Sequence, residues 1–282
     1  MKTVYLVMHQ SKSNLHELTL QVAQALLHNE IVIRTEPWLK QYMGSLSPSL
    51  FSADEAAPID AIISVGGDGT LLRANQISIL HGAPLLGINV GHLGFLADVE
   101  LEQLGTAFEK FQKNDYTLEM RMMLQASVDT HKKLTALNDV VVSRGGSARL
   151  IAVKVYVDQE LVGRYIADGL IVSTPTGSTG YSLSAGGPIV CPDVDCLIIS
   201  PICPHSLQHR PVVISPKQSI TLQMDCEPHR QAQLSIDGQV PLQLKETDKV
   251  IITRSPTDAQ FIRIEPRGFF DLIRYKLSQW SC

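Results

Sequence analysis

The sequence predicts an α/β domain followed by a mostly β domain, with a final helix that returns to the first. A chain of 282 residues exceeds the roughly 150 residues of a typical domain. Its first third alternates short β-branched runs with helical patterns, whereas the chain from residue 116 onward shows one strand-like run after another. We therefore expect a Rossmann-like α/β domain over residues 1–115 and 262–282, and a sandwich-like β domain over residues 116–261.

The first domain should consist of strands connected by helices. In order along the chain we expect strand 3–8, helix 15–28, strand 31–34, strand 61–65, helix 70–80 and strand 84–90. The last three form one βαβ unit. The polar segment 38–58 is rich in Gly, Ser and Pro and suits a surface loop that borders the site. A further helix over 100–112 follows, because five apolar residues fall along one stripe: Leu101, Leu104, Ala107, Phe108 and Phe111.

The second domain should be built from short strands separated by turns. We expect strands at 118–129, 134–143, 150–157, 170–174, 212–214, 219–224, 233–236 and 250–253. The dipeptides Asp168-Gly169, Asp237-Gly238 and Gly145-Gly146 divide them at the spacing of a sandwich. Residues 268–280 then return to a helical pattern.

Charge and hydropathy exclude several classes of partner. The net charge is −4 and there is no long run of Lys or Arg, so we expect no nucleic-acid partner. No stretch approaches the roughly 18 apolar residues that span a bilayer, and the N-terminal apolar run is too short for a signal peptide. We expect a cytoplasmic protein with no membrane partner.

The five cysteines are an odd number without a secretory signal, which favours reduced thiols. Cys191, Cys196, Cys203, His205 and His209 lie close enough in sequence to raise the question of a zinc site. No Cys-x-x-Cys pair accompanies them, so we expect core or loop residues and no metal site there.

The segment Gly66-Gly67-Asp68-Gly69-Thr70 lies between a buried strand and a helix, where unpaired backbone amides favour phosphate. The glycines allow a ligand to approach the backbone closely. A carboxylate would repel phosphate, so Asp68 suits a proton acceptor, an orienter of a hydroxyl or an indirect partner of Mg²⁺. The alternative is that Asp68 caps the helix in a tight turn. The usual nucleotide motifs, G-x-x-x-x-G-K-[ST] and G-x-G-x-x-G, are both absent.

Two further segments carry polar groups where a ligand would need them. Residues 174–188 place many hydroxyls between glycines, preceded by Asp168-Gly169, which suits hydrogen bonds to phosphates or ribose rather than a polar linker. Asn138 and Asp139 interrupt an apolar run. Buried polar groups need partners, so this pair faces a ligand or a polar network, unless it marks a strand end or bulge.

Together these segments resemble the NAD kinase family, and the resemblance extends over most of the chain. The family's Gly-Gly-Asp-Gly-Thr turn stands at 66–70, its Gly-His-Leu-Gly-Phe at 91–95, its Thr-Pro-Thr-Gly-Ser-Thr at 174–179, its Asp-Gly-Gln at 237–239 and its C-terminal helix at 268–277. The first turn alone would not discriminate, because lipid kinases and phosphofructokinases carry similar turns.

The resemblance implies a kinase that transfers the terminal phosphate of ATP to the 2′-hydroxyl of the adenosine ribose of NAD, giving NADP. Mg²⁺ would accompany ATP, and polyphosphate is an alternative donor. The resemblance also implies a homo-oligomer, a dimer or a tetramer.

Roles carry over residue by residue. Asp68 would be the catalytic proton acceptor, Gly69 would cradle the ligand and Phe95 would line the adenine pocket. Asn138 and Asp139 would hold adenosine or its ribose.

The remaining assigned positions lie around the other parts of the ligand. Asp168 would contact the nicotinamide end. The adenine-side ribose and phosphates would be held by Thr179, Gly180, Tyr181, Ser182, Leu183 and Ser184. Arg73, Arg149 and Gln239 complete the binding positions that the resemblance implies.

Three positions depart from the family pattern. Asp139 stands where Glu is usual, Gly180 where Ala is usual, and Ile166 where some bacterial relatives have Arg. The shorter Asp139 lengthens the ribose contact or leaves it to water, and Ile166 leaves the preference between NAD and NADH open.

Two other functions compete with this reading. A kinase of the same turn type acting on a lipid or sugar would have no use for Asn138-Asp139 or for the 174–179 run. A non-catalytic NAD sensor would keep the pocket but need no carboxylate at Asp68. We expect the ligand in the cleft between the two domains.

Overall fold

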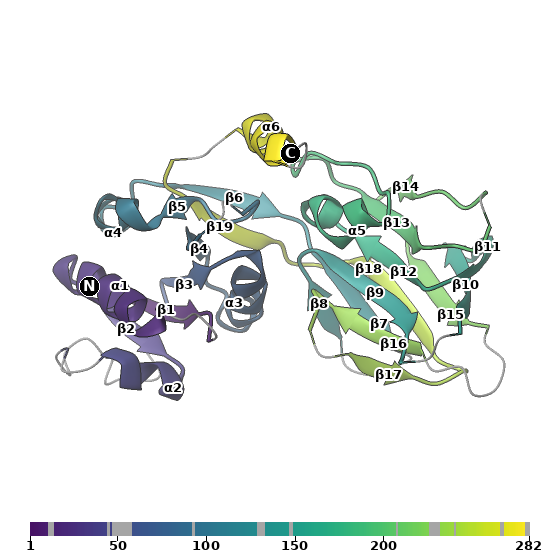
Figure 1. Ribbon diagram of the computed structural model, residues 1–282, viewed down its shortest axis with the longest axis horizontal. Helices are drawn as coiled ribbons and strands as arrows, with labels where there is room; N and C mark the ends of the chain where they lie inside the picture. The colour runs from purple at the N-terminus through teal and green to yellow at the C-terminus, as the bar shows by residue number, and fades with distance from the viewer. Residues whose placement is uncertain are drawn as a thin grey trace. The chain divides into compact units, whose positions relative to one another are not determined.

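The computed structural model describes residues 1–10, 14–43, 46, 58–91, 94–128, 133–146, 149–206, 208–225, 232–239, 241–265 and 268–279. The chain divides into two compact units (Figure 1). The first unit comprises Met1–Met120 and Ala259–Cys282, and the second comprises Arg121–Asp258.

The first unit is built on a seven-stranded sheet in the order β2-β1-β3-β4-β19-β6, with β5 paired to β4. Its strands are β1 Thr3–Met8, β2 Val32–Thr35, β3 Ala61–Gly66, β4 Leu85–Asn89, β5 Val99–Glu100, β6 Thr117–Arg121 and β19 Ala259–Arg263. The pairs β1–β2, β1–β3, β3–β4, β4–β5 and β4–β19 are all parallel.

Helices cover both faces of this sheet (Figure 1). The helices of this unit are α1 Leu15–His28, α2 Pro37–Lys40, α3 Asp68–His81, α4 Leu104–Gln112 and α6 Phe269–Gln279, with short 3₁₀ turns η1 Gln41–Met43 and η3 Leu101–Gln103. Side chains alternate along β3, and Ile63 and Val65 share a buried core with Val22 of α1 and Phe108 of α4. The intervening residues face the other side, where α3 packs on β1, β3 and β4.

The strand order places a switch point between β1 and β3. From β1 the chain moves outward to β2, whereas from β3 it moves in the opposite direction to β4. In open parallel sheets, ligands bind beyond the carboxyl ends of the strands at such a point. Asp68 follows the carboxyl end of β3 here, beside the end of β1 at Met8, which pairs with Val65.

The second unit is a sandwich of two six-stranded sheets, in the orders β11-β10-β15-β18-β7-β8 and β14-β13-β12-β9-β16-β17. Its strands are β7 Leu124–Val128, β8 Leu134–Ala136, β9 Asp139–Arg144, β10 Ile151–Val157, β11 Glu160–Ala167, β12 Gly169–Ser173, β13 Leu197–Ile202, β14 Val212–Ile214, β15 Ile220–Met224, β16 Ala232–Ile236, β17 Leu242–Leu244 and β18 Lys249–Arg254. Neighbouring strands within each of these two sheets are antiparallel.

The two sheets of this unit bury one apolar core between them. Val140 and Val172 from one sheet and Val153 and Ile252 from the other belong to the same cluster. The opposite face of β12 is also covered, because Ile171 packs with Val141 and Ala185, next to the short helix α5 Tyr181–Ser184. The second sheet is therefore buried on both sides where it carries the hydroxyl-rich segment.

The predicted fold class is confirmed: an α/β unit with a parallel sheet, a β-sandwich unit, and a C-terminal helix in the first unit. The sheet of the first unit also includes β6 and β19. The first unit therefore extends to residue 120 and resumes at residue 259, whereas the expected limits were 115 and 262. The strand expected over 118–129 is in fact two strands, β6 and β7, which belong to different sheets. The strand expected over 134–143 is likewise two strands, β8 and β9, of different sheets. The strands β5, β11, β13, β17 and β19 were not predicted.

The helix expected over 100–112 is η3 followed by α4, and a capping box joins Glu100 and Gln103 at its start. The expected loop 38–58 begins with α2 and η1, and its residues 44–45 and 47–57 lie outside the described ones. Within the described ranges, none of the helices combines the length and apolar character that crossing a membrane requires.

Candidate functional site

The glycine turn connects β3 directly to α3. A Cβ at Gly66 would lie 2.4 Å from the Thr70 hydroxyl oxygen, so this position has no room for a side chain. Gly67 and Gly69 are exposed, and a Cβ at either position would meet nothing within 4 Å. Open space beside the first amides of a 14-residue helix is the geometry that a phosphate group requires.

Asp68 does not cap this helix. Gly67 is the N-cap residue, and no side chain caps the end. The Asp68 carboxylate accepts hydrogen bonds from the backbone amides of Phe95 and Leu96, at 3.0 and 3.2 Å. The capping alternative is therefore wrong. An ionised carboxylate has about four acceptor positions, so two bonds leave others for a ligand, and the side chain is partly exposed.

Segment 94–96 lies directly against this carboxylate. A Cβ at Gly94 would be 2.2 Å from Asp68 Oδ1, so only glycine permits the approach. The Phe95 ring is partly exposed, and the Lys276 ammonium of α6 lies 5.6 Å from its centroid. The structure thus brings together Asp68, Gly69 and Phe95, three of the predicted site residues.

Arg73 has a different neighbourhood from the one expected. Its Nη2 donates to the Met8 carbonyl at the end of β1, at 2.6 Å, and lies 3.5 Å from a Glu36 carboxylate oxygen. Its side chain therefore connects α3 to β1 and β2. A phosphate contact would have to be made alongside these two interactions.

In the second unit, Asp237 holds the backbone of the polar pair Asn138 and Asp139. Its carboxylate accepts hydrogen bonds from the amides of Leu137, Asn138 and Asp139, at 2.8, 2.8 and 3.1 Å. Asn138 lies between β8 and β9, so the strand-end alternative holds for the backbone. The predicted site did not include Asp237, although its Asp-Gly turn was noted.

Asn138 and Asp139 differ in how their side chains are used. The Asn138 Oδ1 atom is buried and accepts no hydrogen bond from any residue in the described part of the chain. Asp139 is 6% exposed. Burial raises the pKa of Asp139 to about 7, and the charge of Asp237 acts in the same direction. Because Asp237 accepts three amide hydrogen bonds, we assign the shared negative charge to Asp237 and the proton to Asp139.

The hydroxyl-rich segment is packed against this pair. The Thr174 hydroxyl donates to the Leu137 carbonyl at 2.6 Å, and the Thr174 amide donates to the Asn138 carbonyl at 2.9 Å. A Cβ at Gly177 would lie 2.2 Å from the same Asn138 oxygen. Gly177 thus allows the 3₁₀ turn η4 Thr176–Thr179 to touch the backbone at Asn138.

The residues of this segment are either buried or accessible. The Ser178 hydroxyl is hydrogen-bonded to the backbone of Val190, and the Ser182 hydroxyl to the Ser200 hydroxyl, and both serines are fully buried. The predicted ligand contact of Ser182 therefore does not fit its side chain, which has an internal partner. Thr179, Gly180 and Leu183 are partly exposed, and Tyr181 and Ser184 are exposed.

The remaining predicted residues of this unit lie further along the same sheets. Asp168 precedes β12, and its carboxylate lies 3.0 Å from Arg144 Nε. Arg149 is exposed just before β10. Gln239 is exposed after the Asp237-Gly238 turn, and its carbonyl accepts the Ser235 hydroxyl at 3.0 Å. Ile166, on β11, is partly buried.

The cysteine and histidine cluster does not assemble into a metal site in the described part of the structure. Cys191, Cys196 and Cys203 are free thiols, and no group of three or more His, Cys, Asp or Glu side chains there is arranged to hold a metal ion. His209 instead packs against the ring of Tyr165, with centroids 4.3 Å apart.

Replacing Gly177 and Gly105 separately by Ala should give opposite outcomes. Gly177→Ala forces a Cβ into the Asn138 backbone and should lower the free energy of unfolding by at least about 2 kcal/mol. Gly105→Ala is the matched control, because Gly105 is an exposed residue of α4 and its Cβ would meet nothing within 4 Å. It should raise the free energy of unfolding by up to about 1 kcal/mol, since Ala is the better helix former. Urea unfolding measures both, and equal effects would contradict this packing.

Asp139 should make stability fall as pH rises. Its pKa is about 7 in the folded chain and about 3.9 in the unfolded chain. Its stabilising contribution is complete below the lower value and is lost as pH rises through the higher one.

Asp139→Asn mimics the protonated carboxyl group and does not titrate. The difference in unfolding free energy between wild type and this variant should therefore shift against the wild type by up to about 1.4 kcal/mol per pH unit between pH 5 and 7. Denaturant unfolding at several pH values measures it. Parallel profiles would show that Asp139 is ionised throughout.

Family models match both halves of the chain. The ATP-NAD kinase N-terminal domain matches residues 4–116, and the ATP-NAD kinase C-terminal domain matches residues 137–264. The NAD kinase of Desulforamulus reducens is 37% identical over 100% of this chain and 99% of its own length. The NAD kinase of Moorella thermoacetica is 44% identical over 80% of this chain and 73% of its own length.

Solved structures share the fold. Yeast NADH kinase, solved with NADH, superposes with a TM-score of 0.84 over 95% of this chain and 85% of its own, at 24% identity. An NAD kinase from Archaeoglobus fulgidus, solved with ATP, gives a TM-score of 0.73 over 99% of both chains at 26% identity. With both family models and near full-length relatives in agreement, the chain belongs to the ATP-NAD kinase family.

Proposed function

We propose that this chain is an NAD kinase that transfers the terminal phosphate of ATP to the 2′-hydroxyl of the adenosine ribose of NAD, giving NADP. The observation that carries the proposal is the orientation of Asp68. Two backbone amides hold its carboxylate beyond the carboxyl end of β3, beside a glycine turn with open space for phosphate. Family membership and the near full-length similarity to enzymes named NAD kinase support it.

Phosphoryl transfer needs a positioned hydroxyl and stabilised phosphate charge more than covalent chemistry. The Asp68 carboxylate would accept a hydrogen bond from the ribose hydroxyl and so orient its oxygen toward the terminal phosphate. A carboxylate is a weak base for such a hydroxyl, so the proton would transfer late, when the hydroxyl oxygen already bonds to phosphorus. The released ADP carries the bridging oxygen.

The glycine turn would hold the phosphate groups of the donor or of the dinucleotide. Gly67 and Gly69 present backbone without side chains at the N-terminus of α3, where the helix dipole favours negative charge. Mg²⁺ bound with ATP supplies neutralisation of the phosphate oxygens. Asp68 fits this as an indirect partner, because Mg²⁺ usually keeps several waters through which a nearby carboxylate can hold it.

The second unit would grip the dinucleotide. The buried Asn138 Oδ1, which accepts nothing from the described residues, suits an amino group such as that of adenine. A protonated Asp139 would donate to a ribose oxygen. Thr179, Tyr181 and Ser184 are partly or fully exposed, and their hydroxyls would bind the ribose or phosphates. Phe95 would stack on adenine, and Asp168 would contact the nicotinamide ribose or amide.

We further infer a cytoplasmic homo-oligomer, a dimer or a tetramer. The edge strand β11 exposes Leu161 and Val162 at 53% and 41%, and such edges are commonly paired across a symmetric interface. Free thiols are typical of reducing compartments. Light scattering should give at least twice the 31.0 kDa of one chain. A fully active monomer would contradict this inference.

Identification of the reaction product tests the proposed function. Purified protein should convert NAD, ATP and Mg²⁺ into a product that a strictly NADP-dependent dehydrogenase accepts, and phosphorus NMR should place the new phosphate on the adenosine 2′-oxygen. Phosphate on the 3′-oxygen or on the nicotinamide ribose would contradict the placement of Asp68 against the ligand. Repeating the assay with polyphosphate identifies the donor.

In the same assay, Asp68→Asn should lower turnover by at least about 10²-fold, the usual scale for losing a proton acceptor. NAD binding should stay within about fivefold of wild type, because Asn keeps the size and one acceptor oxygen. Calorimetric titration with NAD measures the binding, and Asp60→Asn, on the same unit away from the turn, serves as the control. Retained turnover in Asp68→Asn would remove Asp68 from the chemistry.

A further inference from the structure

The segment that orients Asp68 is itself held by the last strand of the first unit. Arg263, at the end of β19, is 8% exposed, and its Nη1 donates to the Leu96 carbonyl at 2.9 Å. Its Nε forms an ion pair with Glu119 of β6 at 2.5 Å. The guanidinium carbon also lies 5.1 Å from the centroid of the Phe261 ring. One buried cation therefore joins β19, β6 and the peptide after Leu96.

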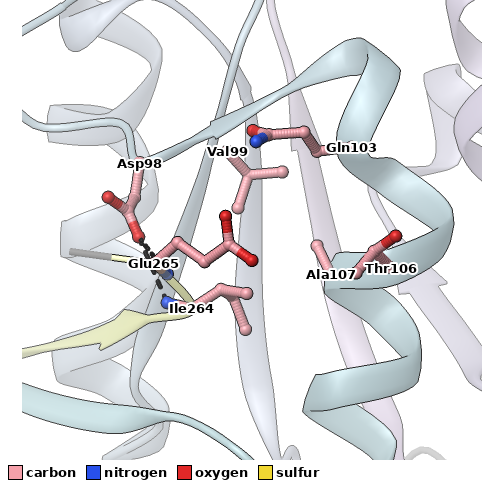
Figure 2. Close-up of a pocket in the computed structure, with 7 residues that line it drawn as sticks. All are labelled: Asp98, Val99, Gln103, Thr106, Ala107, Ile264 and Glu265. Atoms are coloured by element: carbon pink, nitrogen blue, oxygen red, sulfur yellow. Dashed lines mark hydrogen bonds between the residues drawn. The ribbon is translucent and has the colours of Figure 1, made fainter. Parts of the chain in front are cut away.

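A second pair of hydrogen bonds ties the same segment to the residues after β19. The Asp98 carboxylate accepts the amides of Ile264 and Glu265, at 3.1 and 3.4 Å (Figure 2). The Asp98 amide donates to the Gly87 carbonyl of β4 at 3.2 Å. We call these bonds, together with those of Arg263, the clasp. It fixes residues 96–98 through bonds separate from those to Asp68.

Leu96 links the clasp to the catalytic carboxylate. Its carbonyl accepts Arg263, and its amide donates to Asp68 Oδ1. Its side chain is 3% exposed, so the residue has little freedom to move. The two oxygens of Asp68 each accept one amide from residues 95 and 96, and these two amides set the plane of the carboxylate. A shift of residues 95–96 would rotate the carboxylate with them.

We propose that Arg263 is a positioning residue for phosphoryl transfer, acting through the Leu96 peptide to set the orientation of Asp68. The inference rests on the role of Asp68 in the proposed function. Arginine suits the position because its planar group can donate in two directions at once. Lysine keeps the charge and has three N–H donors, but all three lie on one nitrogen, so it cannot reproduce the two contacts that Arg263 makes from separate nitrogens, Nε to Glu119 and Nη1 to the Leu96 carbonyl.

A pocket lies beside the clasp, and an ion pair next to it provides a control substitution. Its volume is about 260 Å³, and Figure 2 shows its lining of Asp98, Val99, Gln103, Thr106, Ala107, Ile264 and Glu265. Lys110 pairs with Glu265 at its rim, at 2.7 Å. Lys110→Ala breaks an ion pair at the same end of β19 without removing a bond to residues 96–98, so it should leave turnover unchanged.

A double-mutant cycle tests the proposal. Arg263→Lys should lower turnover at least about tenfold, since small misplacements of a reacting group are costly, while NAD affinity stays within about threefold. In the Asp68→Asn background the same change should lower the residual turnover less than about twofold, because Arg263 acts through the carboxylate that is missing there. Equal fold-losses in both backgrounds would overturn the proposal.

Hydrogen exchange gives a readout that does not depend on catalysis. In Arg263→Lys the amides of Phe95 and Leu96 should exchange at least about tenfold faster, while the amides of α1 keep wild-type rates. Unchanged exchange at residues 95 and 96 would overturn the clasp, and accelerated exchange throughout the first unit would show general destabilisation instead of positioning.

The two hypotheses fail in different ways. If Asp68→Asn alone retains wild-type turnover, the chemical role of Asp68 is wrong, and with it the positioning role of Arg263, even when exchange at residues 95 and 96 responds. If Asp68→Asn loses turnover but Arg263→Lys keeps it, Asp68 keeps its role and the inference about Arg263 is wrong.

Discussion

Carboxylates that accept backbone amide hydrogen bonds hold the functional segments of both units. Asp68 accepts the amides of residues 95 and 96, Asp98 those of 264 and 265, and Asp237 those of 137, 138 and 139. Charge-assisted bonds of this kind are roughly twice as strong as neutral ones. Each joins chain segments that are distant in sequence, so the loops keep one conformation without regular secondary structure. Without them neither Phe95 nor Asn138 would have a defined position.

Close approach of the backbone in these segments depends on glycine at particular positions. Gly94 lets its segment lie against the Asp68 carboxylate, and Gly177 lets η4 touch the Asn138 carbonyl. Gly67 and Gly69, in contrast, face open space. The glycines of the two motifs therefore serve two different purposes: some allow contact within the protein, and others leave room for what the protein binds.

Local pattern was enough to predict the fold class and the motif-bearing turns. The strand and helix around Asp68 follow from periodicity and from the glycines between them. β19 and β13 were missed, although both are buried, because short apolar runs without a turn signal resemble many other segments. The internal use of Ser182, the interactions of Arg73 and the clamp formed by Asp237 were also beyond sequence reasoning. Each depends on a partner at least 18 residues away in the sequence, which no spacing rule identifies.

The position of β19 has a consequence for how the protein is made. This strand lies between β4 and β6, yet it is the last strand of the chain. During synthesis every strand of the sandwich leaves the ribosome before the α/β sheet receives that strand. Domains usually complete themselves in the order of their synthesis, but here the unit that begins first finishes last. The nascent chain should therefore carry an incompletely oriented Asp68 until β19 emerges, after the whole of the sandwich has been made.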